Sequence, residues 1–267
     1  MMVLSLDAFG SKPGKLHLMS LQLTPQQLGS FETLNITTDI TLRNATLYDW
    51  SARNPIPFHE AWKLQQSIAE QHFHRIKAGT DQFQMEYGDT VLMLQHEPIY
   101  TLGTGSDPAF VLSGGVDVIR MDRGGEVTYH GPGQLVVYPI LDLRGYHQDI
   151  HWYMRALEEA ILIALHNVGL HQAKRQEQVT GVWIGNSKVA AIGIKVRRWI
   201  TMHGLAVNVE HSSLANFQGI VPCGLEGRNV TCINDWLDQP LTTAEFAEYM
   251  KESMEKIFCI KLLPKEL

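Results

Sequence analysis

The sequence predicts an α+β fold, with helices packed on a largely antiparallel or mixed sheet. Two observations support this fold class: many short apolar segments of strand length are separated by turn residues, and two or three longer segments carry apolar residues at three- and four-residue spacing. The chain has 267 residues, of which 45% are hydrophobic. This is enough for a folded core in one large domain or two small ones.

The first quarter of the domain begins with a predicted strand at residues 41–47, where the residues alternate in polarity. A helix is predicted from residue 58 to residue 76, and Gly79 follows where a glycine ends helices. Residues 90–95 (TVLMLQ) are typical of a buried strand. Residues 101–116 are rich in Gly, Ser and Asp and are predicted to form a loop.

The middle of the chain combines two strands and the clearest helix. Strands are predicted at residues 126–129 and 134–141, on either side of a His-Gly-Pro-Gly turn. Residues 150–168 form one apolar stripe at helical spacing. Asp149 is expected to cap this helix, and Gly169 stands where a C-terminal glycine belongs.

The last third contains a predicted hairpin and a closing helix. Residues 179–184 and 188–196 flank a Gly-Asn-Ser turn, which is a β-hairpin signal. Residues 202–209 are predicted to be a further strand, and residues 215–235 are rich in turn residues. Residues 243–258 are predicted to form the final helix.

The composition excludes several classes of protein. With 22 Lys and Arg against 28 Asp and Glu, the formal net charge is −6, which does not favour a nucleic-acid-binding protein. No apolar run approaches the roughly 18 residues that span a bilayer. The 3 cysteines are too few for a disulfide framework, so we expect free thiols in a reducing compartment.

Residues 1–40 are predicted to be a poorly ordered extension that precedes the domain of residues 41–267. The start lacks the cationic and long apolar stretches of a secretory signal. It also lacks arginine, which argues against an organelle transit peptide. We therefore expect a cytoplasmic protein, with a plastid as the alternative if the extension is a transit peptide.

Residues 123–134 (RGGEVTYHGPGQ) carry the densest set of chemical groups in the chain. A cation, a Gly-Gly pair, a hydroxyl, a phenol and an imidazole stand in one turn between strands. A Gly-Gly pair lets the backbone approach a ligand closely, because no side chain blocks it. From the residues alone, a binding loop and a polar hairpin with a hydrogen-bonded histidine both remain open.

No metal site is predicted. His147 and His151 have the spacing of two ligands on one helix face, but no nearby Cys or His motif supplies a third and fourth ligand. Both stand at a predicted helix start, where polar surface residues are normal. We therefore expect them on the surface.

Among the three cysteines, Cys223 lies in a Pro-Cys-Gly turn, where a thiol can be presented, whereas Cys232 and Cys259 have apolar neighbours and are predicted to pack in the core. A nucleophilic thiol needs a partner that favours the thiolate. The candidate partners are Lys188, Lys195, His130 and His203.

Lys188 is the most informative of these partners, because it opens the apolar strand VAAIGI. Burial there would disfavour its charged form, so that it could exchange a proton with a thiol. The alternative is a lysine at a strand end that extends its ammonium to water.

Five blocks of sequence carry a family resemblance: residues 95–98 with 100–103 (QHEP, YTLG), 123–143 (RGGEVTYHGPGQLVVYPILDL), 181–196 (GVWIGNSKVAAIGIKV), 203–209 (HGLAVNV) and 222–224 (PCG). Together they resemble the octanoyl-[acyl-carrier-protein]:protein N-octanoyltransferases, also called lipoyl(octanoyl) transferases. The resemblance extends over residues 48–234 and is greatest to the cyanobacterial and plastid branch.

The resemblance implies the fold of biotin and lipoate protein ligases, with a small C-terminal part from about residue 232. It implies that Cys223 is the acyl-thioester nucleophile and that Lys188 activates it. It further implies these substrate-binding residues: Arg123, Gly124, Gly125, Glu126, Val127, Thr128, Tyr129, His130, Ala191, Ile192, Gly193, Gly204, Leu205 and Ala206.

The implied reaction transfers an octanoyl group from octanoyl-acyl-carrier protein to Cys223, and then to a lysine of a lipoyl domain. The expected acceptors are the lipoyl domains of 2-oxoacid dehydrogenase complexes and the glycine cleavage H protein. No cofactor is expected, because thiol-for-thiol exchange is nearly neutral in energy and needs no ATP. No nucleic-acid or membrane partner is expected. A basic patch that includes Lys195, Arg197 and Arg198 is expected to face the acidic carrier domains.

Three other functions remain as alternatives. An ATP-dependent lipoate or biotin ligase would share the fold but would not rely on a nucleophilic cysteine. A cysteine hydrolase would use Cys223 with His130 or His203. A carrier-domain binding module without catalysis is disfavoured by the presence of both Cys223 and Lys188.

Overall fold

A computed structural model gives the fold. It describes residues 43–79, 88–112, 115–177, 179–221 and 229–266. The predicted extension over residues 1–40 therefore lies outside the described residues. The described helices are α1 (Phe58–Ala78), α2 (Ile150–Asn167) and α3 (Thr243–Phe258). The described strands are β1 (Arg43–Asp49), β2 (Asp89–Leu94), β3 (Ile99–Leu102), β4 (Asp117–Arg120), β5 (Thr128–His130), β6 (Gln134–Ile140), β7 (Ala173–Gln176), β8 (Val179–Ile184), β9 (Ser187–Arg197), β10 (Ile200–Asn208), β11 (Asn229–Val230) and β12 (Ile260–Pro264).

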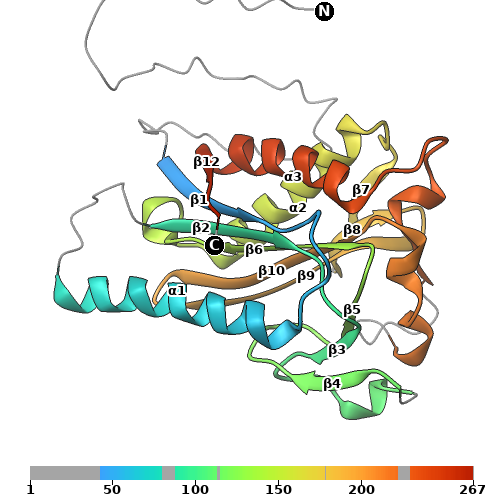
Figure 1. Ribbon diagram of the computed structural model, residues 1–267, viewed down its shortest axis with the longest axis horizontal. Helices are drawn as coiled ribbons and strands as arrows, with labels where there is room; N and C mark the ends of the chain where they lie inside the picture. Colours follow the sequence, from blue (N-terminus) through green and yellow to red (C-terminus); the bar gives the residue numbers. More distant parts are fainter. Residues whose placement is uncertain (1–42, 80–87, 113–114, 178, 222–228, 267) are drawn as a thin grey trace, which may run out of the picture.

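One mixed sheet of nine strands forms the centre of the molecule (Figure 1). Its order is β12-β1-β2-β6-β10-β9-β8-β7, and β11 pairs with β9 outside this path. β1 is parallel to both β12 and β2, whereas the neighbours from β2 to β7 are antiparallel. A second sheet has the order β4-β3-β5. This arrangement confirms the predicted α+β class with a mixed, largely antiparallel sheet.

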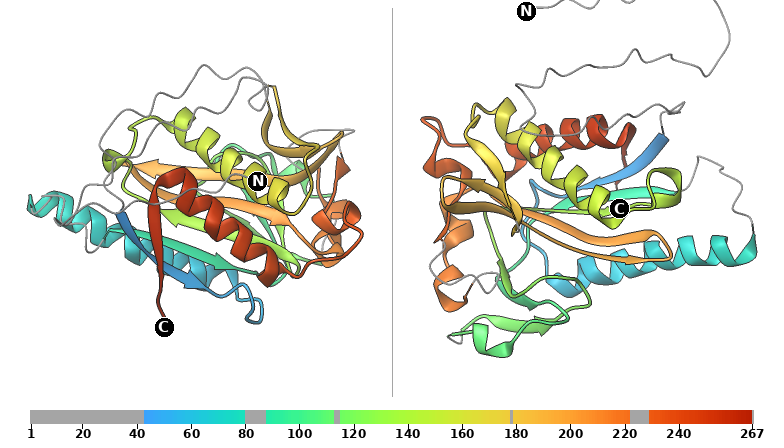
Figure 2. Two further views of the ribbon diagram at one scale, coloured as in Figure 1. Left: turned by 90° about the horizontal axis from the view of Figure 1, so that it is seen from above. Right: turned by 180° about the vertical axis from the view of Figure 1, so that it is seen from behind.

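Helices cover both faces of the large sheet, so its central strands β2 and β6 are buried along their whole length. α2 and α3 lie on one face, and α1 lies along the opposite face (Figures 1 and 2). Leu157 and Phe246 pack in the core on the first side, and Ile68 and Phe73 of α1 pack in the core on the second. The small sheet lies beside the N-terminal end of α1 (Figure 1), where the Phe58 ring stacks on His130 of β5.

The three predicted helices are confirmed, and the caps explain their positions. Asp149 accepts hydrogen bonds from the backbone N–H groups of His151 and Trp152 at the start of α2. Thr242 and Glu245 form a capping box at the start of α3. Gly79 takes the left-handed conformation, with a φ of 65°, directly after α1.

Five strands were not predicted, namely β3, β4, β7, β11 and β12. Each has five residues or fewer, too few for an alternation of polarity to be distinctive. The predicted loop over residues 101–116 is wrong at its start, because Thr101 and Leu102 belong to β3. The subdomain boundary at about residue 232 stays a prediction; α3 and β12, which follow it, contribute to the same core as α2. No described helix has the length and hydropathy of a membrane span.

Candidate functional site

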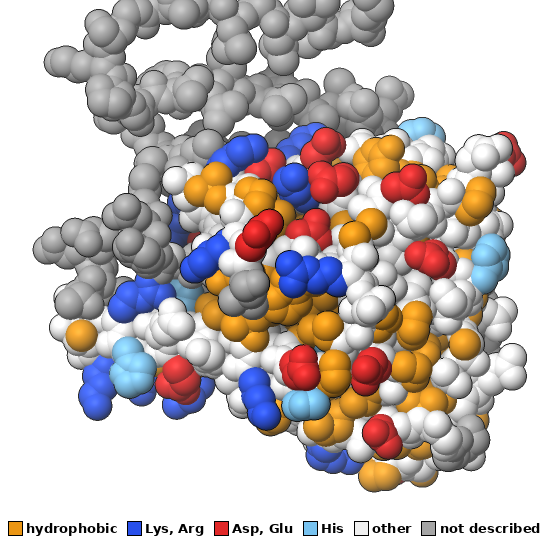
Figure 3. Space-filling model, in the orientation of Figure 1, with side chains coloured by type: hydrophobic (Ala, Val, Ile, Leu, Met, Phe, Trp, Pro, Cys, Tyr) orange, Lys and Arg blue, Asp and Glu red, His pale blue; other side chains and the backbone are white. Residues whose placement is uncertain are grey.

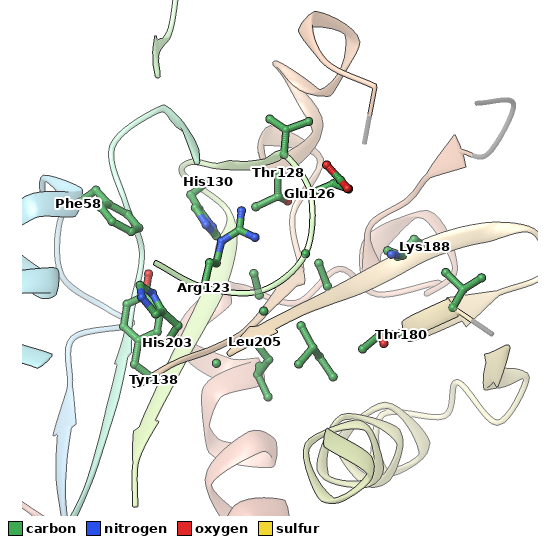
Figure 4. Close-up of a pocket in the computed structure, with 18 residues that line it drawn as sticks. Phe58, Arg123, Glu126, Thr128, His130, Tyr138, Thr180, Lys188, His203 and Leu205 are labelled. Atoms are coloured by element: carbon green, nitrogen blue, oxygen red, sulfur yellow. The ribbon is translucent and has the colours of Figure 1, made fainter. Parts of the chain in front are cut away.

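A cavity of about 260 Å³ lies between the segment that leads into β5 and the strands β8, β9 and β10 (Figure 4). Its lining residues are Phe58, Arg123, Gly125, Glu126, Val127, Thr128, His130, Tyr138, Val179, Thr180, Lys188, Ala191, Ile192, Gly193, His203, Gly204, Leu205 and Ala206. All the predicted substrate-binding residues except Gly124 and Tyr129 are therefore brought to one cavity. Their contact with substrate stays a prediction.

Gly124 and Tyr129, the two predicted binding residues that do not line the cavity, contact other parts of the protein. The Tyr129 side chain is 1% exposed, and its ring packs edge-to-face on Tyr100 and Phe217. The Gly124 N–H donates to the carbonyl of Ile194 at 2.9 Å, which fixes the loop to β9. Both residues thus hold the loop in place.

Arg123 is buried and is anchored to β3. Its guanidinium donates to the Thr101 carbonyl at 2.6 Å, to the Thr101 hydroxyl at 2.8 Å and to the Gly124 carbonyl at 3.0 Å. A planar guanidinium holds several acceptors at once, which an ammonium cannot do in the same geometry. Arg123 therefore connects the cavity loop to the small sheet while its side chain forms part of the cavity wall.

Close backbone packing explains two of the glycines near the loop. A Cβ atom added to Gly103 would lie 1.7 Å from the carbonyl oxygen of Gly125. A Cβ atom added to Gly204 would lie 2.2 Å from the carbonyl oxygen of Val137. These glycines let segments of the protein approach one another, as well as leaving the cavity free of side chains at Gly204.

Lys188 lies at one end of the cavity, and Phe58, Tyr138 and His203 lie at the other (Figure 4). Lys188 is 7% exposed, so of the two possibilities left open for this lysine the structure shows the buried one. Its Nζ lies 4.9 Å from the centre of the Trp183 ring. Gly181 lies beside it, with a φ of 122°, and a Cβ added there would lie 2.6 Å from the Ala190 carbonyl oxygen, so the close approach of β8 to β9 requires a glycine.

Aromatic side chains gather at the end of the cavity away from Lys188, beside the Arg123 guanidinium, and two histidines there are uncharged. His130 Nδ1 lies 2.8 Å from Gln134 Oε1, and His96 Nε2 lies 2.8 Å from the Tyr138 hydroxyl. Burial lowers the pKa of His96 to about 4 and the pKa of His130 to about 3. Both imidazoles are therefore neutral at pH 7. His130 lines the cavity, whereas His96 supports the lining residue Tyr138.

Four lining residues were not predicted: Phe58, Tyr138, Val179 and Thr180. They come from α1, β6 and β8, segments far apart in the sequence that the sheet order brings together. Asp122 was also missed. It stands directly before Arg123, and its carboxylate contacts both Lys195 and His203.

The structure describes two of the three cysteines, Cys232 and Cys259. Cys223 lies outside the described residues. Cys232 is fully buried, and burial raises the pKa of its thiol to about 11, as expected for a packing residue. Cys259 is partly buried and ends α3 in the left-handed conformation. Burial raises the pKa of its thiol as well.

The structure shows the surroundings of the two histidines predicted on the surface and of the expected basic patch. His147 and His151 are exposed, as predicted, and the His147 ring packs on Trp152. In the expected basic patch, Lys195 pairs with Asp122 and Arg197 pairs with Glu70 at 3.9 Å, so carboxylates offset two of the three charges. On the face seen in Figure 3, Lys and Arg side chains are interspersed with Asp and Glu.

Comparison with known protein families gives one match for most of the chain. Residues 57–255 match the model of the lipoyl protein ligase A/B catalytic domain. Among curated proteins, a chloroplastic octanoyltransferase of Arabidopsis thaliana is 42% identical over 228 residues, which cover 78% of this chain and 79% of the relative. An octanoyltransferase of Synechococcus sp. is 43% identical over 216 residues, covering 79% of this chain and 84% of the relative.

Solved structures support the same fold. The crystal structure of a lipoate-protein ligase A bound with ATP has a TM-score of 0.60 at 16% sequence identity, over 85% of this chain and 89% of that one. A bipartite lipoate protein ligase from Thermoplasma acidophilum has a TM-score of 0.59 at 17% identity, over 85% of this chain and 87% of that one. At these identities the similarity shows the fold alone, and it confirms the predicted ligase-like architecture.

Proposed function

We propose that this chain, which belongs to the lipoyl protein ligase A/B catalytic-domain family, works through an acyl-thioester on Cys223. Its activity is that of an octanoyltransferase of protein lipoylation. In general terms, the donor is an octanoyl-loaded acyl carrier and the acceptor is a lipoyl domain. The specific acceptors, lipoyl domains of 2-oxoacid dehydrogenase complexes and the glycine cleavage H protein, are part of the proposal.

One observation supports this proposal above the others: the cavity places the buried Lys188 at one end and Phe58, Tyr138 and His203 at the other, with Leu205 between them. The Arg123 guanidinium in the same wall is held by the carbonyls of Thr101 and Gly124. An extended acyl chain along this wall would gain roughly 0.8 kcal/mol for each buried methylene. Its thioester carbonyl would then lie at the Lys188 end. The backbone carbonyl of Lys188 also accepts a hydrogen bond from the Thr231 N–H at 3.0 Å, and in the sequence Thr231 stands about eight residues after Cys223.

The proposed reaction has two balanced steps. The Cys223 sulfur attacks the thioester carbonyl, the S–C bond to the carrier breaks, and Lys188 passes the cysteine proton to the departing carrier thiol. The ε-amine of the acceptor lysine then attacks the acyl-Cys223 carbonyl. The C–N bond of an amide forms as the C–S bond to Cys223 breaks, and the proton that leaves the amine returns to the Cys223 sulfur through Lys188.

An intact-mass experiment on the full chain tests the proposal. After incubation with octanoyl-acyl-carrier protein, the wild type is expected to gain the mass of one octanoyl group, and hydroxylamine is expected to remove it. Cys223→Ala is expected to gain nothing, whereas the matched control Cys259→Ala is expected to behave as the wild type. An adduct that persists in Cys223→Ala would show that the nucleophile is assigned wrongly.

A second experiment separates the alternatives. Addition of a lipoyl domain to the acyl-enzyme, without ATP, is expected to give the octanoyl amide on the domain. Strict dependence on ATP would favour a ligase, and release of free octanoate would favour a hydrolase. Binding of the carrier without any transfer of the octanoyl group would favour a binding module without catalysis.

The compartment is a further part of the proposal. We propose a cytoplasmic location, and the chloroplastic relative makes a plastid the alternative. Import of the full chain into isolated chloroplasts, with shortening of the chain, would favour the plastid. Absence of import would favour the cytoplasm.

A further inference from the structure

Asp122 connects the cavity loop to two strands of the large sheet. It stands between β4 and β5, directly before Arg123. One carboxylate oxygen pairs with the Lys195 ammonium on β9, and the other lies 3.0 Å from His203 Nε2 on β10. Together with the hydrogen bond from Gly124 to Ile194, these contacts fix the loop against the hairpin β9–β10.

His203 has an unusual backbone conformation for a strand residue. Its φ is 58°, in the left-handed region that a residue with a side chain rarely adopts. The conformation is held from two sides, because its N–H donates to Gln65 Oε1 at 2.8 Å and its ring contacts Asp122. Such strained residues persist where the surroundings over-determine them, and they are concentrated at functional sites.

The contact with Asp122 also determines which ring nitrogen carries the proton. Burial lowers the pKa of His203, although Asp122 opposes this shift, so the ring is neutral at pH 7. A neutral imidazole has one N–H, and a carboxylate accepts but does not donate. The Nε2–H therefore donates to Asp122, and Nδ1 carries no proton.

We propose that Asp122 is a positioning residue that fixes the His203 ring and the cavity loop, and thereby shapes the end of the cavity that receives the acyl tail. This inference rests on the proposed function. His203 and Lys188 lie at opposite ends of the cavity (Figure 4), so the effect of Asp122 falls on binding of the acyl chain and spares the proton transfer at Lys188.

Steady-state kinetics of octanoyl transfer test this role. Asp122→Ala is expected to raise the KM for the octanoyl donor about tenfold and to leave kcat within about threefold of the wild type. Asp122→Asn keeps an oxygen that accepts from His203 and is expected to hold the KM within about threefold. Glu70→Gln is the matched control, because it breaks the other ion pair of β9, with Arg197, outside the cavity lining.

Two kinetic results would overturn the inference. The first is an unchanged KM in Asp122→Ala, or a fall in kcat at unchanged KM. The second is an equal rise of KM in Glu70→Gln, because general loosening of β9 would then explain the effect.

The ¹⁵N resonances of the His203 ring in the full chain give a readout that does not depend on catalysis. The wild type is expected to show a neutral ring protonated at Nε2, and Asp122→Ala is expected to lose this preference. A wild-type ring protonated at Nδ1 would overturn the inference whatever the transfer assay shows. A wild type with the expected ring that transfers no octanoyl group would instead refute the proposed function.

Discussion

The Lys188 ammonium lies 4.9 Å from the centre of the Trp183 ring, and the two residues pair directly across β9 and β8. An aromatic face attracts a cation, whereas burial disfavours it. The pairing thus gives a buried lysine a defined place at one end of the cavity. Glu158 of α2 fixes the neighbouring backbone, because its carboxylate accepts the Gly181 N–H at 3.0 Å.

Replacement of Lys188 is expected to slow the acyl-transfer step. Lys188→Met removes the proposed proton carrier and is expected to lower the rate of acyl-enzyme formation by about 10²- to 10⁴-fold, as measured by rapid quench and intact mass. Lys188→Arg is expected to be as slow, because a guanidinium does not release its proton near pH 7. The exposed Lys174→Met is the control. An active Lys188→Arg enzyme would refute the proton-transfer role.

Enlargement of Ala206 is expected to change acyl-chain selectivity. Ala206 is 5% exposed, lines the cavity and pairs with Ala191 across β10 and β9. Ala206→Leu adds three carbons to the wall and is expected to lower kcat/KM for the octanoyl donor by about 10- to 200-fold, and for a butanoyl donor much less. Equal losses for both donors would show that the substitution harms the site in general.

Stability is expected to fall on acidification because His96 and His130 are buried as neutral rings. Their folded-state pKa values of about 4 and about 3 lie below the ordinary value of 6.5, so below pH 6.5 the unfolded chain binds protons that the folded chain does not. Between pH 7.5 and pH 5.5, each histidine is expected to remove about 1.4 kcal/mol from the free energy of unfolding.

Urea unfolding at these two pH values measures the effect. His130→Gln is expected to reduce the difference in unfolding free energy between the two pH values by about 1.4 kcal/mol, the contribution of one histidine. His151→Gln, at an exposed position, is expected to leave this difference unchanged. An unaltered pH difference in His130→Gln would show that the pKa of this ring is the same in the folded and unfolded protein.

Glu158→Gln is expected to destabilise the fold near Lys188. The carboxylate is 1% exposed and contacts Arg175 at 3.0 Å and Arg155 at 2.6 Å. Its neutralisation is expected to lower the free energy of unfolding by about 2–3 kcal/mol, less than for a fully buried pair because both arginines reach solvent. The more exposed Glu159→Gln should cost under about 1 kcal/mol. Equal losses would show that burial of Glu158 has no energetic effect.

Charge reversal at Arg198 tests the expected basic patch. Arg198 is exposed, whereas carboxylates pair with the other two cations of the patch. Arg198→Glu is expected to raise the KM for the acidic acyl carrier about threefold at low salt, and less at high salt. An unchanged KM at low salt would count against a carrier contact here.

The sequence by itself determined the features that depend on neighbouring residues. Asp149 and Thr242 cap the two helices whose apolar stripes were visible, and the hairpin turn before Lys188 was recognisable from Gly-Asn-Ser. The family resemblance named the residues of the loop and of β9 and β10 that line the cavity, because these lie in continuous motifs.

Only the tertiary structure decided how distant segments meet. The pairing of β1 with β12, the contact of Asp122 with Lys195 and His203, and the closure of the cavity by Phe58 all join segments that are remote in sequence. Periodicity and capping report on local backbone preference, whereas strand order depends on how several apolar faces are buried together. The same reason explains why β12 escaped prediction: five residues at a sheet edge become a strand only when β1 is present to pair with them.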